Sequence, residues 1–285
     1  PAAGDPLLTD PAATTGASML CRAAWRSGRA MGIKFGPIVP ANAARGLPTI
    51  HTLVALFDGT SGAPVAVIDG HPITNWKTAA DSALGQRHLA REGSRRLLMV
   101  GAGTLAPYLV RAHLAVRPSL TEVAIWNRSP ERARALAGQL AAAGIAAGVA
   151  EDLEAAVRGA DVISTATMAS EPLVRGAWLK PGTHLDLVGS FLPGMREADR
   201  EATRRGRLFV DSREGTVGRC GELLDAFADG LDEAGLGGDL YEICGEGRGR
   251  RDAEEITLFK NAGGGHLDLM TAEYVAGRLG LAAAS

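Results

Sequence analysis

The chain is poor in cysteine, has no excess of either charge, and has no long apolar run. Its three cysteines, Cys21, Cys220 and Cys244, show no CxxC spacing, which argues against a disulfide framework and fits a reducing, cytoplasmic compartment. Its 30 basic and 32 acidic residues leave a formal net charge of -2, which gives no electrostatic basis for binding nucleic acid or an anionic membrane. No uncharged apolar stretch reaches the roughly 20 residues of a membrane-spanning helix. We therefore expect neither a nucleic-acid nor a membrane partner.

The composition is that of a globular protein, with 285 residues of which 46% are hydrophobic and 22% charged. This length suits one large domain or two of medium size. The polar, Pro- and Ala-rich start is expected to be trimmed or poorly ordered. It lacks a positive start followed by an apolar core, so we expect no signal peptide.

The first third of the chain predicts antiparallel strands followed by a helix. The turn-like DGTSG, in which Gly59 and Gly62 can take a positive φ, predicts a hairpin between two of the strands. A helix is predicted over residues 74–93, with Thr74 or Asn75 as its N-cap. The expected strands cover residues 31–39, 49–58 and 63–70.

From residue 95 onward, apolar strands alternate with helices, which predicts an α/β fold with a parallel, doubly wound sheet. The last helix, residues 266–280, could close this nucleotide domain or pack back on the first part, and we favour the second. We expect a dinucleotide-binding domain over residues 93–261. Residues 1–92 and 262–285 are expected to form a smaller α+β domain. The expected strands cover residues 95–101, 121–127, 145–150, 160–167, 184–190 and 207–212, with one more before residue 262, and the expected helices cover residues 104–116, 129–144, 151–159 and 221–230.

A glycine loop follows the first of these strands and opens a helix, which is the setting that a dinucleotide-binding GxGxxA motif requires. Gly101 permits the tight turn, Gly103 lets the backbone approach a pyrophosphate, and Ala106 allows close contact between helix and strand. The N–H groups at the start of the helix face the anion. Thr104 and Leu105, which complete the loop, are expected to line the cofactor site.

The end of the next strand favours NADP(H). An NAD-binding loop places Asp or Glu there to bind the ribose hydroxyls, but this chain has no carboxylate at the strand tip. Arg128 can pair with a 2′-phosphate and stack on adenine, and Asn127 and Ser129 can donate hydrogen bonds to it. Arg132 lies one helical turn further on. We expect NADPH as the cofactor, with NADH bound more weakly.

Several segments resemble the ornithine cyclodeaminase and mu-crystallin family when taken in order. They include the Lys34 segment, KTAADSA, VGAGTLA, VGSFLPGMREAD and EITLFKNAGGG. The resemblance runs from about residue 19 to the end. It implies a homodimer in which a Rossmann domain is inserted into a substrate-binding and dimerisation domain. It also implies hydride transfer between a nicotinamide cofactor and the α-carbon of an amino or imino acid.

The resemblance further implies a carboxylate-binding site. Lys34 stands where the family has a strand lysine, and Lys77 takes the usual place of Arg in an RTAA motif, followed here by Thr78. The change matters because Arg grips a carboxylate with a bidentate fork, whereas Lys acts as a point charge. A further family arginine has no counterpart before Met19. That contact is absent, lies outside this sequence, or is supplied by Arg22.

Phe191 stands where cyclodeaminases and archaeal alanine dehydrogenases of the family carry a catalytic Asp. Cyclodeamination needs a base, and Phe cannot act as one. Reduction of a preformed imine needs only a hydride, a carboxylate anchor and a proton. Phe191 could also pack on the ring methylenes of a cyclic imino acid. We therefore predict a reductase that forms L-proline or L-pipecolate from the cyclic imines.

The remaining site residues are expected near the nicotinamide or the reacting nitrogen. The proton donor is left open between His51, a water and Lys77, the last only if burial disfavours its charged form. A cyclodeaminase with tightly bound NAD and a crystallin-like binding protein without activity remain as alternatives. No histidine spacing suggests a metal site. The residues expected at the nicotinamide are Thr165, Ala166, Ser190, Lys260 and Asn261.

Overall fold

The computed structural model describes residues 2–4, 6–9 and 16–281, and it divides into two compact units. One unit comprises Pro1–Lys77 and Gly264–Ser285, and the other comprises Thr78–Gly263. The division falls inside helix α1 (Gly70–Leu89), whereas the sequence suggests a boundary at residue 92. Part of the start that we expected to be trimmed or poorly ordered, residues 10–15, lies outside the described residues.

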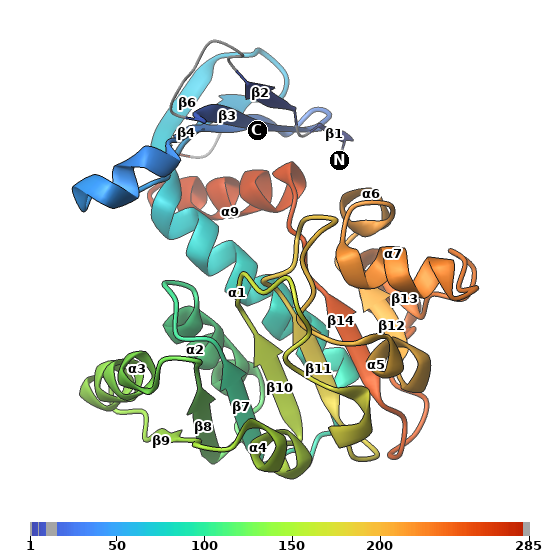
Figure 1. Ribbon diagram of the computed structural model, residues 1–285. Helices are drawn as coiled ribbons and strands as arrows, with labels where there is room; N and C mark the ends of the chain where they lie inside the picture. Colours follow the sequence, from blue (N-terminus) through green and yellow to red (C-terminus); the bar gives the residue numbers. More distant parts are fainter. Residues whose placement is uncertain (1, 5, 10–15, 282–285) are drawn as a thin grey trace. The chain divides into compact units, whose positions relative to one another are not determined.

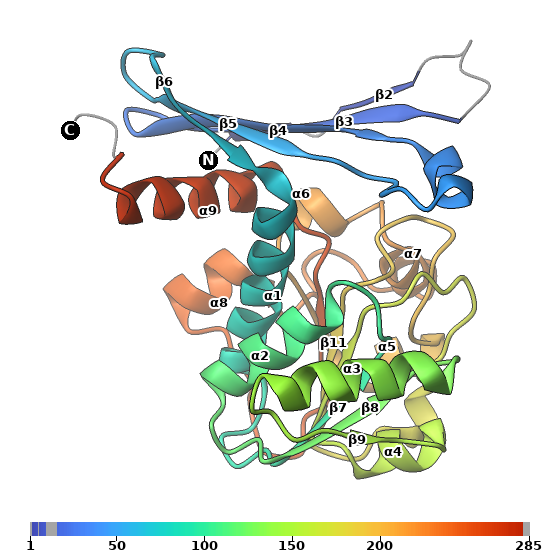
Figure 2. The same ribbon diagram turned by 90° about the vertical axis from the view of Figure 1, so that its left-hand side faces the viewer.

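The first unit contains a six-stranded antiparallel sheet in the order β1-β3-β4-β5-β6, with β2 also paired to β3 (Figure 1 and Figure 2). Three of these strands, from the apparently irregular start of the chain, were not expected. The segment SMLCRAAWR, for example, forms a nine-residue strand. The strands are β1 (Ala2–Gly4), β2 (Leu7–Thr9), β3 (Ser18–Arg26), β4 (Ala30–Ile38), β5 (Leu53–Asp58) and β6 (Pro64–Asp69), and a 3-10 helix, η1, covers Pro40–Arg45.

The C-terminal helix α9 (Gly265–Arg278) lies along one face of this sheet (Figure 2). Its apolar side chains pack with those of β3, β4, β5 and β6 in one core cluster. Gly32 on β4 allows the close approach, because a Cβ there would lie 2.9 Å from Cδ1 of Leu269. The helix therefore packs back on the first part of the chain, the position that we favoured.

Two local expectations need correction. In the hairpin between β5 and β6, Gly62 has a φ of 72°, but Gly59 has no positive φ and instead lies against the backbone of Ala30. Helix α1 begins at Gly70, four residues before Thr74. Asp69 accepts a hydrogen bond from the N–H of His71 at 2.9 Å at this helix start. The Thr74 hydroxyl instead bonds the carbonyl of Gly70, 2.8 Å away and within the helix, so the predicted N-cap was wrong.

The second unit is a parallel, doubly wound α/β domain (Figure 1). Its eight strands follow the order β13-β12-β14-β11-β10-β7-β8-β9, which contains the Rossmann order on both sides of β7. The strands are β7 (Arg96–Val100), β8 (Glu122–Trp126), β9 (Gly148–Val149), β10 (Val162–Thr165), β11 (His184–Leu187), β12 (Arg207–Val210), β13 (Gly238–Asp239) and β14 (Thr257–Lys260).

Helices cover both faces of this sheet. Successive residues of β7 belong to different core clusters: Leu97 and Met99 to one, Leu98 and Val100 to the other. Side chains of a strand alternate between faces, so each face has its own apolar core. The helices are α2 (Ala106–Val116), α3 (Pro130–Ala142), α4 (Leu153–Gly159), α5 (Arg200–Arg205), α6 (Arg213–Thr216), α7 (Gly221–Ala228) and α8 (Leu240–Glu246), with a 3-10 helix, η2, at Gly176–Trp178.

Candidate active site

The glycine loop between β7 and α2 has the geometry of a pyrophosphate cradle. Gly101 has a φ of 110°, and a Cβ there would lie 2.6 Å from the carbonyl oxygen of Ala166, so only glycine fits. A Cβ on Gly103 would have nothing within 4 Å, which leaves its backbone open to a ligand. No side chain caps α2 at Leu105, but the Ala106 N–H bonds the carbonyl of Gly103 at 3.1 Å and Pro107 has no N–H, so the loop backbone before the helix is the part open to an anion. These residues fit a dinucleotide, and Thr104 is exposed beside them.

Two arginines and a hydrogen-bonded asparagine follow the end of β8. The Asn127 side chain accepts a hydrogen bond from the Ala102 N–H at 3.2 Å and donates one to the Ser129 carbonyl at 3.0 Å. Asn127 therefore ties the glycine loop to the start of α3. Arg128 and Arg132 are exposed, and neither side chain makes a hydrogen bond or ion pair with another described residue. Both guanidinium groups are available to a phosphate.

A carboxylate that the sequence reasoning overlooked lies beside these cations. The Ser129 hydroxyl donates a hydrogen bond to Oε2 of Glu131 at 2.9 Å. Hydrogen bonds from the Glu131 N–H and from Ser129 hold the pKa of Glu131 below its usual value. The expected role of Ser129 as a phosphate donor therefore competes with an ionised neighbour. Glu131 follows the strand tip by only five residues, and that spacing could have revealed it.

Two of the polar residues expected at the nicotinamide point into the protein. The hydroxyl of Thr165 donates to the carbonyl of Asp186 at 3.3 Å, and Thr165 is fully buried. The Asn261 amide donates to the Thr78 carbonyl at 3.0 Å and to the Ser82 hydroxyl at 2.9 Å. These side chains therefore brace the carboxyl edge of the sheet, and of the five residues expected at the nicotinamide only Ala166 is partly exposed.

Ser190 and Lys260 are likewise fully buried and hydrogen-bonded to each other. The Lys260 ammonium donates to the Ser190 hydroxyl at 2.6 Å, and that hydroxyl donates to Oε1 of Glu222 at 2.5 Å. We expect both residues near the nicotinamide, and the structure shows that their side chains are turned into the protein. Glu222 accepts the hydrogen of the Ser190 hydroxyl, so this hydroxyl already has a partner within the protein.

In the first unit, Lys34 and Lys77 meet at Asp268 on α9. Nζ of Lys34 lies 2.9 Å from Oδ2 of Asp268, and Nζ of Lys77 lies 3.5 Å from Oδ1. All three side chains are at most 4% exposed. Lys34 also donates to the Thr74 hydroxyl at 3.4 Å. The structure thus brings together the two lysines that the sequence resemblance pairs as carboxylate ligands.

This cluster contains more positive than negative charge. Arg22 on β3 is paired in register with Lys34 on β4, so it adds a third cation to the same face. Asp268 is the carboxylate that pairs with the two lysines. Nζ of Lys77 is buried and has no hydrogen-bond partner among the described residues. A buried ammonium without such a partner is costly, which suggests that an anionic ligand completes the site.

Burial and neighbouring charge shift the ionisation of this cluster. Burial, reinforced by the charge of Lys77 and opposed by Asp268, lowers the pKa of Lys34 to about 8. Burial alone would raise the pKa of Asp268, but Lys77 and Lys34 hold it below its usual value. Asp268 is therefore ionised, and Lys34 can change its charge near neutral pH.

His51 does not join this cluster. It is exposed, lies just before β5, and lines a pocket with Phe35 and Leu53. Phe35 follows Lys34 on the same strand, so their side chains point to opposite faces of the sheet. Of the two protein groups that we considered as proton donors, only Lys77 lies with the cation cluster.

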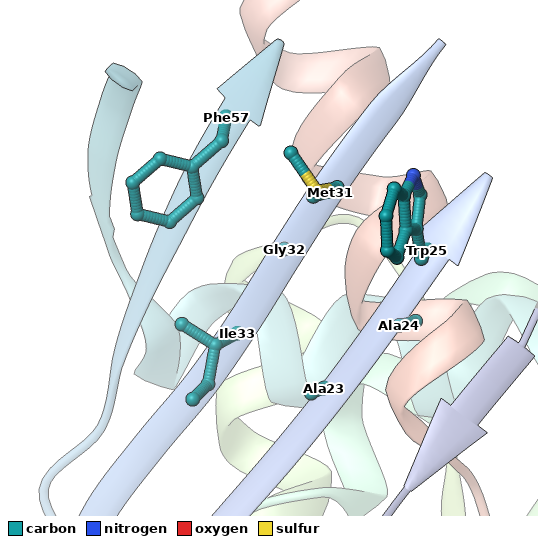
Figure 3. Close-up of a pocket in the computed structure, with 7 residues that line it drawn as sticks. All are labelled: Ala23, Ala24, Trp25, Met31, Gly32, Ile33 and Phe57. Atoms are coloured by element: carbon teal, nitrogen blue, oxygen red, sulfur yellow. The ribbon is translucent and has the colours of Figure 1, made fainter. Parts of the chain in front are cut away.

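The outer face of the antiparallel sheet is apolar and exposed. Figure 3 shows Trp25, Met31, Ile33 and Phe57 projecting from three neighbouring strands around a shallow pocket. Trp25 is 53% exposed, and Val67 on β6 is 71% exposed. An apolar face of this extent is typical of a protein–protein interface.

Across residues 2–4, 6–9 and 16–281, no helix combines the length and apolar character needed to span a bilayer. The same part of the chain contains no cluster of three or more His, Cys, Asp or Glu residues suited to a metal ion.

Residues 14–280 match the ornithine cyclodeaminase/mu-crystallin family. The chain belongs to this family. It is 49% identical over 263 residues to a Δ1-pyrroline-2-carboxylate reductase of Paracoccus denitrificans, an alignment that covers 91% of this chain and 83% of that protein.

Two solved structures have a fold similar to that of this chain. That of Thermococcus litoralis Δ1-pyrroline-2-carboxylate reductase in complex with NADH and L-proline has a TM-score of 0.87 and 30% identity, covering 99% of this chain and 90% of the other. An archaeal alanine dehydrogenase dimer with bound NAD has a TM-score of 0.86 and 27% identity, covering 98% and 87%.

Sequence reasoning missed the acidic members of these sites. Asp268 lies on the buried face of α9 together with Leu269, Ala272 and Ala276, and a charge on an otherwise apolar face was a detectable signal. Glu197 is also fully buried. Burial raises the pKa of its carboxyl, although the charge of Lys260 and the hydrogen bonds from Thr167 partly lower it. No spacing rule links Glu197 to its partners, which come from separate loops.

Proposed function

We propose that this family member is an NADPH-dependent reductase of cyclic imino acids, with NADH as a weaker cofactor. Its substrates are Δ1-pyrroline-2-carboxylate, which gives L-proline, and Δ1-piperideine-2-carboxylate, which gives L-pipecolate. The observation that carries this proposal is the buried ammonium of Lys77, which has no hydrogen-bond partner among the described residues and lies in a cation-rich cluster. A small carboxylate would supply the missing partner.

The lysine cluster binds and orients the substrate. Lys34 and Lys77 attract its carboxylate, while Asp268 keeps the two ammonium groups in place before it arrives. A preformed site loses less side-chain entropy on binding, and holding the reacting carbon in one orientation is a large part of catalysis in hydride transfer. Thr78 follows Lys77 on α1, and its carbonyl is already bonded to Asn261.

The second unit binds the dinucleotide. Gly101, Gly103 and the start of α2 would hold its pyrophosphate, and Arg128 would pair with the 2′-phosphate that distinguishes NADPH. The bound cofactor supplies the hydride. Arg132 lies one turn further along α3 and adds positive charge near the same position.

The reduced nitrogen must also gain a proton. Lys77 remains our candidate donor, because its ammonium lies in the carboxylate site, and we discard His51 because it faces away from that site. A water molecule is the other candidate donor. If Lys77 is the donor, its replacement impairs both substrate binding and proton transfer. If water is the donor, the same replacement impairs substrate binding alone.

Phe191 favours imine reduction over cyclodeamination. Its side chain is 46% exposed, which leaves an apolar surface for the ring methylenes of the substrate. It offers no base for the deamination of ornithine. Relatives named as reductases also share more sequence with this chain than does a lysine cyclodeaminase structure, which is 28% identical.

A homodimer in the cytoplasm is part of this proposal. The apolar outer face of the antiparallel sheet supports pairing with a second copy through this surface (Figure 3). A Trp25→Glu variant should then elute as a monomer, whereas unchanged size would contradict this interface. Cys21, Cys220 and Cys244 are free thiols, as expected in a reducing compartment.

The experiment that tests the function is a substrate panel. NADPH oxidation would be followed with Δ1-pyrroline-2-carboxylate, Δ1-piperideine-2-carboxylate, and pyruvate plus amines. We expect turnover with at least one cyclic imine and with NADPH in preference to NADH. Ammonia release from ornithine without net cofactor turnover would establish a cyclodeaminase instead. Cofactor binding without turnover of any substrate would indicate a binding protein.

A further inference from the structure

One buried carboxylate, that of Glu197, holds together the loops that follow β10 and β11. Its Oε1 accepts hydrogen bonds from the Thr167 N–H at 2.6 Å and the Thr167 hydroxyl at 2.7 Å. Its Oε2 accepts from the N–H groups of Gly189 at 2.6 Å and Ser190 at 3.3 Å. Glu197 is fully buried, so water does not compete for these four bonds.

A second buried layer holds Glu197 in turn. Oε1 of Glu222 accepts hydrogen bonds from the Glu197 N–H at 2.7 Å and from the Ser190 hydroxyl at 2.5 Å. The Lys260 ammonium lies 2.6 Å from that hydroxyl and 3.7 Å from Oε2 of Glu222, which compensates part of the negative charge. Lys260 ends β14, so the network also joins a third strand end to the two loops.

The same network reaches the glycine loop through Thr167. A Cβ on Gly101 would lie 3.0 Å from Cγ2 of Thr167, which shows how closely the loop after β10 packs on the glycine loop. A Cβ on Gly189 would overlap the backbone of Thr167. Glu197 therefore sets the spacing between the first dinucleotide-binding loop and its neighbours along the sheet edge.

We propose that Glu197 is a positioning residue for the nicotinamide half of the cofactor, an inference that rests on the proposed reductase function. In open parallel sheets, ligands bind beyond the carboxyl ends of the strands, with the pyrophosphate on the first loop. The loops after β10 and β11 are the adjoining ones, and Glu197 orders both before the cofactor binds. Glu222, Ser190 and Lys260 support it, so that none of these four side chains needs to touch the cofactor.

The test compares two ligands in a Glu197→Gln variant. Gln has the same shape, but its amide presents hydrogens to N–H donors, so at least one loop loses its anchor. NADPH contains the nicotinamide, whereas 2′-phospho-ADP-ribose contains only the rest of the cofactor. Titration calorimetry should show that NADPH binds about tenfold more weakly, which is the size expected for the loss of a charged hydrogen bond. The affinity for 2′-phospho-ADP-ribose should change less than about twofold. The kcat for imine reduction should fall as well.

Two further variants serve as a control and as a second test. Glu201→Gln replaces an exposed acid on the neighbouring helix α5 and should leave both affinities unchanged. Thr167→Val removes only the hydroxyl bond to Glu197 and should weaken NADPH alone by a smaller factor. If Glu197→Gln does not fold, Thr167→Val decides the question with the same two ligands.

Two outcomes would overturn the inference. Equal weakening of both ligands would mean a general disturbance of the domain, and unchanged binding of both would mean that the loops need no anchor. Neither reading depends on imine turnover. If the wild-type protein binds NADPH but reduces no imine, the proposed function is contradicted. The binding data would still decide the role of Glu197.

Discussion

Lys34 on β4 and Asp268 on α9 form a buried ion pair, with Nζ and Oδ2 2.9 Å apart. They are 234 residues apart in sequence, and the pair joins the first sheet to the helix that returns to it. Because Lys77 approaches the same carboxylate, a single acid organises both cations that we assign to the substrate.

Removal of this acid should destabilise the fold. Asp268→Asn leaves the two buried lysines without their counter-ion and should lower the free energy of unfolding by about 3–5 kcal/mol, as when one partner of a buried pair is removed. Urea denaturation measures this. Glu273→Gln, which breaks the more exposed pair with Arg26, is the control and should cost less than about 1 kcal/mol. Similar losses in both variants would show that the cluster has no special charge imbalance.

Lys77 should contribute strongly to the specificity constant. Lys77→Met keeps a side chain of similar length but removes the charge. The kcat/KM for the cyclic imine should then fall roughly a hundredfold, which is the equivalent of one charged hydrogen bond. Lys180→Met is the matched control, since Lys180 instead pairs with Asp161 at 2.8 Å. Unchanged kinetics in Lys77→Met would remove Lys77 from the site.

Carboxylate binding should weaken as the pH rises. The lowered pKa of Lys34, about 8, means that its ammonium loses its charge as the pH passes that value. Affinity for pyrrole-2-carboxylate, whose carboxylate stays ionised, should be full below pH 8 and decline above it. Lys34→Arg cannot lose its charge in this range and should flatten the profile. A wild-type affinity constant across this range would contradict the assignment.

The same shift has a consequence for stability. The folded-state pKa of Lys34 lies below its ordinary value of 10.5, so the unfolded chain binds the extra proton between the two values. Stability should therefore gain from Lys34 as the pH rises from about 8 toward 10.5. Added ligand should oppose this gain, because it favours the charged lysine. Thermal unfolding with and without pyrrole-2-carboxylate separates the two effects.

Arg128 should select between the two cofactors. Arg128→Ala removes the cation that we pair with the 2′-phosphate, so the KM for NADPH should rise far more than that for NADH. Arg158→Ala is a suitable control, since that guanidinium pairs with Glu154 at 2.7 Å on the separate helix α4. Equal losses for NADPH and NADH in Arg128→Ala would refute the phosphate assignment.

Glu131 should act in the opposite direction. Its ionised carboxylate occupies the Ser129 hydroxyl and repels a nearby phosphate. Glu131→Gln should therefore improve the KM for NADPH while leaving that for NADH nearly unchanged, and added salt should reduce the difference. An unchanged NADPH/NADH ratio would mean that the phosphate lies too far from Glu131 to be affected.

Local patterns in the sequence determined much of this protein. Apolar strands alternating with helices predicted the parallel sheet, and Gly101 and Gly103 predicted the tight loop that we propose for the dinucleotide, because backbone geometry and strand burial leave direct traces in nearby residues. Lys34 and Lys77 were named from the family resemblance, and their meeting at one carboxylate was decided by the tertiary structure.

The acids that organise these sites were decided by the tertiary structure alone. Asp268, Glu197 and Glu222 each act on groups from other strands and loops, and their spacing in the chain carries no sign of those partners. Ser190 and Lys260 look like surface ligands in the sequence, but they are buried against Glu222. A charge becomes part of a buried network only when distant segments remove it from water, and that depends on how the whole chain packs.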